Sequence, residues 1–516
     1  MRQLLKKIIV LISIFVILIS IIAIFSLCPP EGPWPTPPWC DSCKIKIGGH
    51  TNLTMVVSIP YNSHNSNIRL LIKGTKPRVM EQIGYLTYKT TIPVVGQEEI
   101  EYMFESIDGI SKQKSTKITK KNMTIYDGVS SWSNLNFSPA FSKNFEFDMM
   151  MFDTWGRNYN FLMIENTRDN IESSFERLKQ LKIKKVVVTD MFRVVSNKKN
   201  VYNSTDYKIE DAIFLDDFRD ESLTKKDMIN LAKSAHRNGM KLAVETSISF
   251  INYGKYMTSR NIREDWDADL KKQTQNKTKD WVEDFYDKKE KKLLEVVHEL
   301  DDAGVDEIFV NQRNEIPLEP YEDYANKRLV ELIDKIHNES SLKVNFFVKE
   351  KDVFYDDWNK KKKLFDSADN IYIIIERVDK RYKPFYGMNF TNIKNNFSAL
   401  LNDYRIWAEY NNLSVNVYFG VSSYKDSIIN GYIEFNDIRN PMIKKLVPDW
   451  QYQADVYEAF LQSAENYSFI KGITFMGYWW DDAMDPETAK TRISISFSNR
   501  NKNVESTINK WTNTIN

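Results

Sequence analysis

The sequence is short of histidine, of cysteine and of any excess of charge of one sign, and each shortage excludes a class of function. Only five histidines occur in 516 residues, and none stands at the end of a predicted strand. An imidazole-based metal site and a Ser-His-Asp triad are therefore not expected. No glycine-rich phosphate-binding motif follows a strand, and we expect no cofactor. The net charge of +1 implies no nucleic acid as partner.

All three cysteines lie in one proline-rich stretch near the N-terminus. Residues 28–43 read CPPEGPWPTPPWCDSC, which predicts a stiff, polyproline-like spacer. No βαβ pattern surrounds Cys40 and Cys43. They therefore favour a local disulfide, or a bond to Cys28 of another copy, over a redox centre.

The segment before the spacer, residues 1–27, contains the one long apolar run of the chain. Ile8–Leu27 carries no charge and is long enough to cross a bilayer as a helix. Basic residues precede it, so we expect a cytoplasmic stub and the bulk of the chain outside the cell membrane. A cleaved signal peptide and a lipid anchor at Cys28 are the alternatives.

Ten N-x-S/T sequons follow the anchor, which agrees with an exported glycoprotein. An asparagine-rich chain also produces such sequons by chance, and that alternative stays open. They begin at Asn52, Asn122, Asn136, Asn203, Asn276, Asn338, Asn389, Asn396, Asn412 and Asn466.

Residues 44–126 show short runs of β-forming residues separated by Asn, Ser and Gly turns. This pattern predicts a small antiparallel β-sandwich, which serves as a carbohydrate-binding module or as a plain spacer. A loop-like stretch, Asp127–Phe145, leads into the main domain. The expected strands are Thr54–Pro60, Ile68–Gly74, Gly84–Val95 and Glu98–Ile107.

The remainder, within residues 127–516, alternates apolar runs with segments of helical period in eight units. This order predicts an α/β fold, a (β/α)8 TIM barrel, with a doubly wound open sheet as the alternative. The expected strands are Met149–Trp155, Lys185–Met191, Lys241–Thr246, Glu307–Asn311, Lys343–Val348, Asn370–Arg377, Ser414–Val421 and Gly472–Tyr478.

Carboxylates and tryptophans gather just after these strands, where the mouth of such a barrel lies. Glycoside cleavage needs two carboxyl groups, and aromatic rings stack against sugars. Each acid could instead cap a helix or pair with a basic residue. Asp481 and Asp482 could also bind Ca²⁺, without further support. The candidates are Asp153, Trp155, Asp190, Glu245, Asn314, Glu315, Glu350, Asp352, Glu376, Arg377, Trp479, Trp480, Asp481 and Asp482.

Three stretches resemble clan A (β/α)8 glycoside hydrolases, and most of all their β-mannanase-like members. Trp281–Glu315 is similar to the third helix and fourth strand of these enzymes, Asp449–Asp482 to the seventh helix and eighth strand, and Phe497–Glu505 to their closing S-x-R-x-K-x-x-E stretch. The resemblance implies that Glu315, after Asn314, is the acid/base.

One position departs from the family. Its nucleophile is a glutamate that ends strand seven, and this chain has Ser422 and Ser423 there. Glu434 from the following loop or Glu376 would have to replace it, or the site is inactive. We therefore expect a surface glycosidase that acts on a β-linked carbohydrate. The alternative is a non-catalytic barrel that binds glycan or holds a surface layer.

Overall fold

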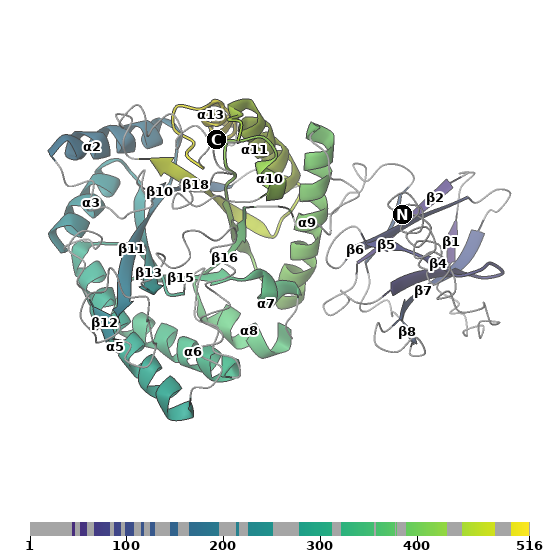
Figure 1. The fold of residues 1–516 in the computed structure, drawn as a ribbon, viewed down its shortest axis with the longest axis horizontal. Coiled ribbons are helices and arrows are strands. Elements are labelled where there is room, and N and C mark those ends of the chain that lie inside the picture. Colours follow the sequence, from purple (N-terminus) through teal and green to yellow (C-terminus); the bar gives the residue numbers. More distant parts are fainter. Residues whose placement is uncertain are drawn as a thin grey trace, which may run out of the picture.

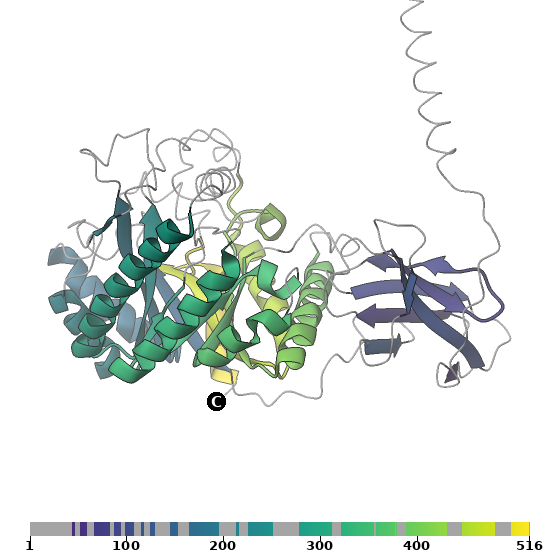
Figure 2. The same cartoon turned by 90° about the horizontal axis from the view of Figure 1, so that it is seen from below.

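A computed structural model shows two bodies side by side, a large barrel and a smaller set of strands (Figures 1 and 2). Helix α9 (Phe390–Asn411) lies on the side of the barrel that is nearest the smaller body. The structure describes residues 44–46, 52–58, 67–82, 87–93, 99–107, 115–117, 124–128, 145–152, 165–195, 213–215, 225–250, 278–311, 321–354, 358–376, 378, 389–430, 446–479 and 497–514.

The smaller body consists of two antiparallel sheets, as the short β-runs predicted. One sheet has the order β1-β7-β3-β4, with β8 on β7, and the other has the order β5-β6-β2-β9. Asp127 and Gly128 still belong to β9, so the predicted loop begins two residues too early. The strands are β1 (Lys44–Lys46), β2 (Asn52–Ser58), β3 (Asn67–Ile72), β4 (Arg78–Val79), β5 (Glu81–Gln82), β6 (Thr87–Pro93), β7 (Glu99–Ile107), β8 (Ser115–Lys117) and β9 (Thr124–Gly128).

Eight parallel strands close into a barrel, because the first strand pairs with both the second and the last. The predicted (β/α)8 barrel is therefore confirmed, and the open sheet is excluded. A short strand, β12 (Ile213–Leu215), adds antiparallel to the end of β11. The barrel strands are β10 (Glu146–Phe152), β11 (Lys185–Val195), β13 (Lys241–Phe250), β14 (Glu307–Phe309), β15 (Lys343–Val348), β16 (Asn370–Ile375), β17 (Val415–Phe419) and β18 (Ile470–Trp479).

One helix follows each barrel strand and packs on its outside (Figure 1). These are α2 (Glu165–Gln180), α3 (Lys225–Arg237), α5 (Lys279–Ala303), α6 (Glu322–Glu339), α8 (Trp358–Ser367), α9, α11 (Trp450–Ala464) and α13 (Asn503–Thr514). Two shorter helices, α7 (Glu350–Phe354) and α10 (Ser427–Asn430), lie in the connections after β15 and β17.

No apolar period in the sequence predicts α8, and the reason is physical. Trp358, Leu364 and Phe365 bury one face of the helix, but the fourth buried position on that face is Lys361. The Lys361 ammonium pairs with Asp352 and Glu322, so a charged residue occupies a core-facing place. A lysine at such a position hides the apolar period on which helix prediction depends.

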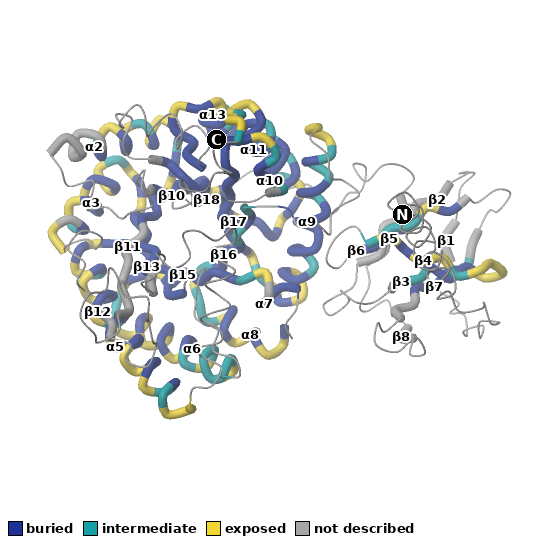
Figure 3. The backbone as a smooth tube through the Cα atoms, viewed as in Figure 1, coloured by how far each residue is buried: buried dark blue, intermediate teal, exposed yellow. Residues whose placement is uncertain are grey.

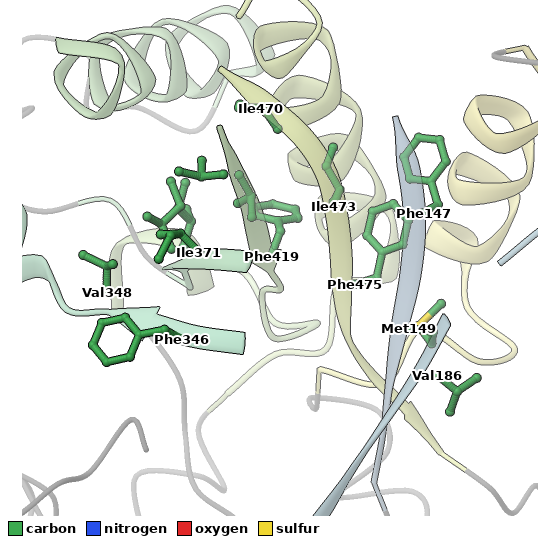
Figure 4. Close-up of a cluster of buried hydrophobic side chains, with 14 of the residues drawn as sticks. Phe147, Met149, Val186, Phe346, Val348, Ile371, Phe419, Ile470, Ile473 and Phe475 are labelled. Carbon is green, nitrogen blue, oxygen red and sulfur yellow. The ribbon is translucent and has the colours of Figure 1, made fainter. Parts of the chain in front are cut away.

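The main hydrophobic core lies between the barrel and its ring of helices. Strand residues that point outward pack there against the inner faces of the helices, and Figure 4 shows Phe147, Met149, Phe419, Ile473 and Phe475 among them. Figure 3 shows the same arrangement along the backbone, with buried strands inside helices whose outer sides are exposed. The continuous apolar runs of the sequence arise because parallel strands bury both faces.

A second core fills the inside of the barrel, to which each of the eight strands contributes one residue. Phe309 stacks on Phe347 with ring centroids 4.6 Å apart, while small Ala243 makes room among the larger side chains. The barrel is therefore packed and not hollow at this level. The members are Met150, Val187, Ala243, Phe309, Phe347, Tyr372, Tyr418 and Met476, with Phe497 from beyond β18.

Buried charges lie below this layer, at the N-terminal ends of the strands. The Lys185 ammonium lies 3.2 Å from Asp148 and 2.9 Å from Glu307, and it donates to the Tyr372 hydroxyl at 2.8 Å. Asn345 donates to Glu307 as well, at 2.9 Å. Burial opposes the charge of Lys185, but Asp148, Tyr372 and Glu307 together hold its pKa well above the usual value. We call Asp148, Lys185, Glu307, Asn345 and Tyr372 the base cluster.

The stretch Phe497–Glu505 joins the last strand to the first helix. Glu505 accepts two hydrogen bonds from Arg177 of α2, at 2.7 and 2.5 Å, and one from the Tyr478 hydroxyl at 2.9 Å. Arg500 donates to Ser174 of α2 at 2.5 Å. These buried and partly buried contacts hold the closed ring together at the β10–β18 seam.

Three of the sequon asparagines have structural roles in α9. Asn389 caps the helix N-terminus by accepting from the backbone N–H of Asn392, and Asn412 ends the helix in the left-handed conformation. Asn396 is 3% exposed, so the folded chain offers no room for a glycan there. Within the described ranges no helix is long and apolar enough to span a membrane. The expected anchor, residues 8–27, lies outside those ranges.

Lys185→Met should destabilise the barrel by about 3–5 kcal/mol, because it leaves two buried carboxyl groups without their cation. The matched control is Lys184→Met, since the neighbouring Lys184 is exposed. It should change stability by less than about 0.5 kcal/mol. Urea unfolding followed by tryptophan fluorescence measures both, and equal stability of the two variants would contradict the assigned role of Lys185.

Candidate active site

Two predicted carboxylates lie at the C-terminal end of the barrel interior. Glu245 follows Ala243 on the inward face of β13 and is buried at 5% exposure. Glu376 comes directly after β16 and continues the inward alternation of Tyr372 and Ile374. It is partly exposed. The structure therefore brings acids from strands three and six to the end of the barrel where chemistry occurs in this fold.

At the end of strand four, side-chain hydrogen bonds take the place of the backbone hydrogen bonds to the two neighbouring strands. The Asn311 amide donates to the Phe347 carbonyl at 2.6 Å and accepts from the Phe347 N–H at 2.7 Å. On the other side, the Thr246 hydroxyl donates to the Phe309 carbonyl at 2.7 Å. Both side chains are buried. They hold the end of β14 against β13 and β15 just before the chain leaves toward Glu315 in sequence.

The end of strand seven has no room for an inward side chain. A Cβ atom added at Gly420 would lie 2.5 Å from the Met476 Cβ on the neighbouring strand, which is closer than real Cβ atoms approach. The next inward position is Ser422, which is buried. Its carbonyl accepts from the Ser427 hydroxyl at 2.6 Å. These contacts give Ser422 a structural role.

Ser423 is buried beside a lysine of the closing stretch. The Lys502 ammonium donates to the Ser423 hydroxyl at 2.7 Å, and burial lowers the pKa of Lys502 well below its usual value. The Ser423 carbonyl accepts from the N–H of Asp449, the residue that caps α11. The strand-seven segment is thus fixed to α11 and to the closing stretch, and neither serine faces open solvent.

Most of the other predicted site residues lie outside the described ranges. These are Asp153, Trp155, Asn314, Glu315, Arg377, Glu434, Trp480, Asp481 and Asp482. The backbones of Asp190 and Trp479 lie in β11 and β18, and the structure does not describe their side chains. Their predicted roles stay predictions.

Asp352 caps a helix and pairs with a basic residue, which was the alternative to a role in catalysis. Its carboxylate accepts from the N–H of Lys349 at 2.9 Å and pairs with the Lys361 ammonium. The residue caps α7 and neutralises a buried lysine. It therefore contributes to the structure of the fifth loop and not to a mouth of free carboxylates.

The described histidines lie on outer helices, as the sequence predicted. His236, His298 and His337 belong to α3, α5 and α6 and pair with Asp306, Glu339 and Asp369. In the part of the chain that the structure describes, no three His, Cys, Asp or Glu residues gather as a group that could hold a metal ion.

Sequence reasoning missed the roles of Asn311 and Gly420. Asn311 was read as the last residue of strand four, because an asparagine that replaces backbone pairing looks like any polar strand end. Gly420 carried a weak signal, since glycine within a strand often marks a close backbone approach. The partner of that approach, Met476, is 56 residues away and cannot be found from the local pattern.

Gly420→Ala should lower the free energy of unfolding by about 1–3 kcal/mol, because the added methyl group overlaps Met476 in a packed interior. Ser422→Ala, at the next inward position, removes one oxygen atom and adds no volume, and it serves as the control. Thermal or urea unfolding of both variants checks the comparison. A Gly420→Ala variant as stable as the wild type would show that the strand-seven end has room for a side chain.

Comparisons with known proteins give structural neighbours only. No family model and no curated protein matches the sequence. A GH113 β-1,4-mannanase aligns with 72% of this chain and 99% of its own, at 13% identity and a TM-score of 0.48. A GH113 β-mannanase from Alicyclobacillus acidocaldarius aligns with 74% of this chain and 100% of its own, at 15% identity and a TM-score of 0.43.

A β-glucuronidase from an uncultured Clostridium species aligns with 92% of this chain and 68% of its own, at 11% identity and a TM-score of 0.38. β-Mannanases, the group that the sequence resemblance named, are thus among these neighbours. Identities and TM-scores of this size transfer no residue role. The closed order of eight parallel strands establishes the fold of this chain without them.

Proposed function

We propose that the protein is a glycoside hydrolase that cleaves a β-linked poly- or oligosaccharide with two carboxyl groups. One observation supports the proposal: the closed barrel brings the ends of strands three, four and six to one end, where Glu245 and Glu376 occupy inward positions. Acids on separate strand ends of a barrel can flank a glycosidic bond from two sides.

Glu315 is the proposed acid/base, because it follows strand four after Asn314 as in the family that the sequence resembles. Glu434 is the first candidate for the nucleophile and Glu376 the second. In the proposed reaction the acid protonates the leaving oxygen, while the second carboxylate attacks the sugar or activates a water. Asp153, Trp155, Asp190, Trp479, Trp480, Asp481 and Asp482 are the proposed sugar contacts.

A non-catalytic glycan-binding barrel is the second candidate, and the strand-seven end favours it. Gly420 excludes an inward side chain there, and Ser422 and Ser423 are both buried. If no carboxylate replaces the missing one, the barrel keeps a mouth for sugar but lacks the second catalytic group. Binding of a polysaccharide without cleavage would identify this case.

Glu315→Gln should abolish turnover of oligosaccharides and leave aryl glycosides with good leaving groups partly active, because only the former need a proton donor. Glu434→Gln should abolish both. The full-length protein is first screened on β-linked polysaccharides and aryl β-glycosides to find the substrate. Full activity of Glu434→Gln on either substrate would eliminate Glu434 and make Glu376 the next nucleophile to test.

We also propose that residues 8–27 anchor the chain in the cell membrane, with the barrel outside. The support is the uncharged run after a basic flank. Protease added to intact cells should therefore degrade the barrel, and a cytoplasmic marker protein should survive. Protection of the barrel until the cells are lysed would contradict this topology.

A further inference from the structure

We propose that Asp148 is a proton-binding site built into the base of the barrel, with the Thr474 hydroxyl as its hydrogen-bond partner in the protonated state. Both residues lie far from the mouth, at the opposite end of the strands. The inference is independent of glycosidase activity. It rests on the balance of charges and hydrogen bonds in the base cluster.

The base cluster holds one negative charge too many. Asp148 and Glu307 are both buried, at 2% and 3% exposure, and share the single ammonium of Lys185. Tyr372 and Asn345 complete the cluster and are neutral. An uncompensated buried carboxylate is costly, and taking up a proton is the ordinary way in which proteins avoid that cost.

The hydrogen bonds show which of the two carboxyl groups takes the proton. One oxygen of Glu307 receives two close donors, the Lys185 ammonium and the Asn345 amide, both at 2.9 Å. Asp148 has the weaker ion pair at 3.2 Å, through Oδ2. Among the described residues its Oδ1 makes no hydrogen bond. Asp148 is therefore the worse-solvated anion of the pair.

An acceptor for the proton lies on the adjacent strand. Asp148 and Thr474 are opposite each other in the β10–β18 pairing. Each precedes by two residues a side chain of the inner core, Met150 or Met476, and so lies on the inward face of its strand. The Thr474 hydroxyl is fully buried and, like Asp148 Oδ1, makes no hydrogen bond within the described part of the chain. The Thr474 hydroxyl can donate or accept. A proton on Oδ1 would make Asp148 a donor as well, and we propose that the Thr474 oxygen then accepts from it.

Other charged groups surround the cluster at the lower rim. Glu146 precedes Asp148 on its own strand, and Lys241, Lys343 and Lys471 begin or lie near the start of β13, β15 and β18. Lys241 and Lys343 are exposed, so water screens them. Lys471 is exposed as well. Partial desolvation of its ammonium lowers its pKa, Lys185 and Lys343 lower it further, and Glu146 and Glu307 raise it. Within the described part of the chain, Asp148 forms its ion pair with Lys185 and with none of these groups at the rim.

The direction of the titration agrees with this geometry. Burial, the largest influence, raises the pKa of Asp148 from 3.8 to about 6, in spite of Lys185. The folded chain thus binds this proton more tightly than the unfolded chain. Its contribution to stability is complete below pH 3.8 and is lost as the pH rises through about 6. This slope is opposite to that of an ordinary paired carboxylate.

Asp148→Asn tests the site, because asparagine imitates the protonated acid and cannot titrate. Unfolding of the full-length wild type and variant is measured between pH 4 and pH 7. The wild-type folding equilibrium constant, divided by that of Asp148→Asn, should fall on the order of 100-fold as the pH rises. A ratio that stays constant across this range would overturn the proposal.

Thr474→Val tests the partner, since it keeps the shape of the side chain and removes the hydroxyl. In this background the same ratio should fall several-fold less, because the protonated carboxyl group has lost its acceptor. An unchanged fall would contradict the role of Thr474, and a larger fall would show that its hydroxyl instead donates to the ionised carboxylate. If Asp148→Asn does not fold, infrared spectra of the wild type decide. A carboxyl band that is lost with a midpoint near pH 6, above the range in which ordinary Asp and Glu side chains ionise, supports the site, and a carboxyl band that is lost entirely within that ordinary range rejects it.

A bound metal cation could also neutralise the excess negative charge of the base cluster. Unfolding in different salts distinguishes a bound cation from a bound proton. Wild type and Asp148→Asn are unfolded at pH 7 in sodium, potassium and choline chloride at equal ionic strength. A proton site predicts the same difference between the proteins in all three salts. A wild type that sodium or potassium stabilises selectively, with no such effect on Asp148→Asn, would assign the site to a metal cation instead.

Discussion

The Lys185 ammonium is the contact on which the barrel depends, because it joins its own strand to a neighbouring strand and to two strands that are not its neighbours. Through Asp148, Glu307 and Tyr372 it links the second strand to the first, fourth and sixth. Apolar contacts alone tolerate small shifts of one strand along another, whereas a buried ion pair does not. The base cluster therefore fixes the strand register at one end of the barrel. The aromatic layer of Phe309, Phe347, Tyr372 and Tyr418 then packs directly above it.

The fold was largely predictable because parallel strands covered by helices leave a repeated local signal. Val186–Val188 and Phe346–Val348 are apolar runs, and Gly239 and Gly304 follow helices in the left-handed conformation. The exceptions arise where charge replaces apolar packing. Lys361 hides α8, and the base cluster looks like ordinary charged strand starts. The partners of Lys361, Asp352 and Glu322, lie outside its helix, and two of the partners of Lys185 are more than 100 residues away, so a helical or strand period cannot reveal them.

The candidate site was less predictable than the fold, for a different reason. Strand order determines which loops meet at the mouth, and the sequence pattern was enough for that. Whether a strand end carries a usable side chain depends on its neighbour across the sheet. Met476 leaves Gly420 no room, and Asn311 uses its amide to hold Phe347. The absence of a strand-seven glutamate is therefore part of the packing of the barrel, and a single substitution at Gly420 would not restore it.

The two ends of the barrel thus have different roles: the base stabilises the fold, and the mouth carries the proposed function. The base closes the ring with buried charges and needs nothing from the loops. At the mouth, Glu245 and Glu376 are supplied by strands, while a partner for Glu315 must come from a residue that lies beyond a strand. Loops can change without disturbing the closed ring, because their residues are not part of its ladder. A barrel of this kind can gain or lose catalysis in its loops while its fold stays the same, which is why enzyme and glycan-binding protein are the two functions in question here.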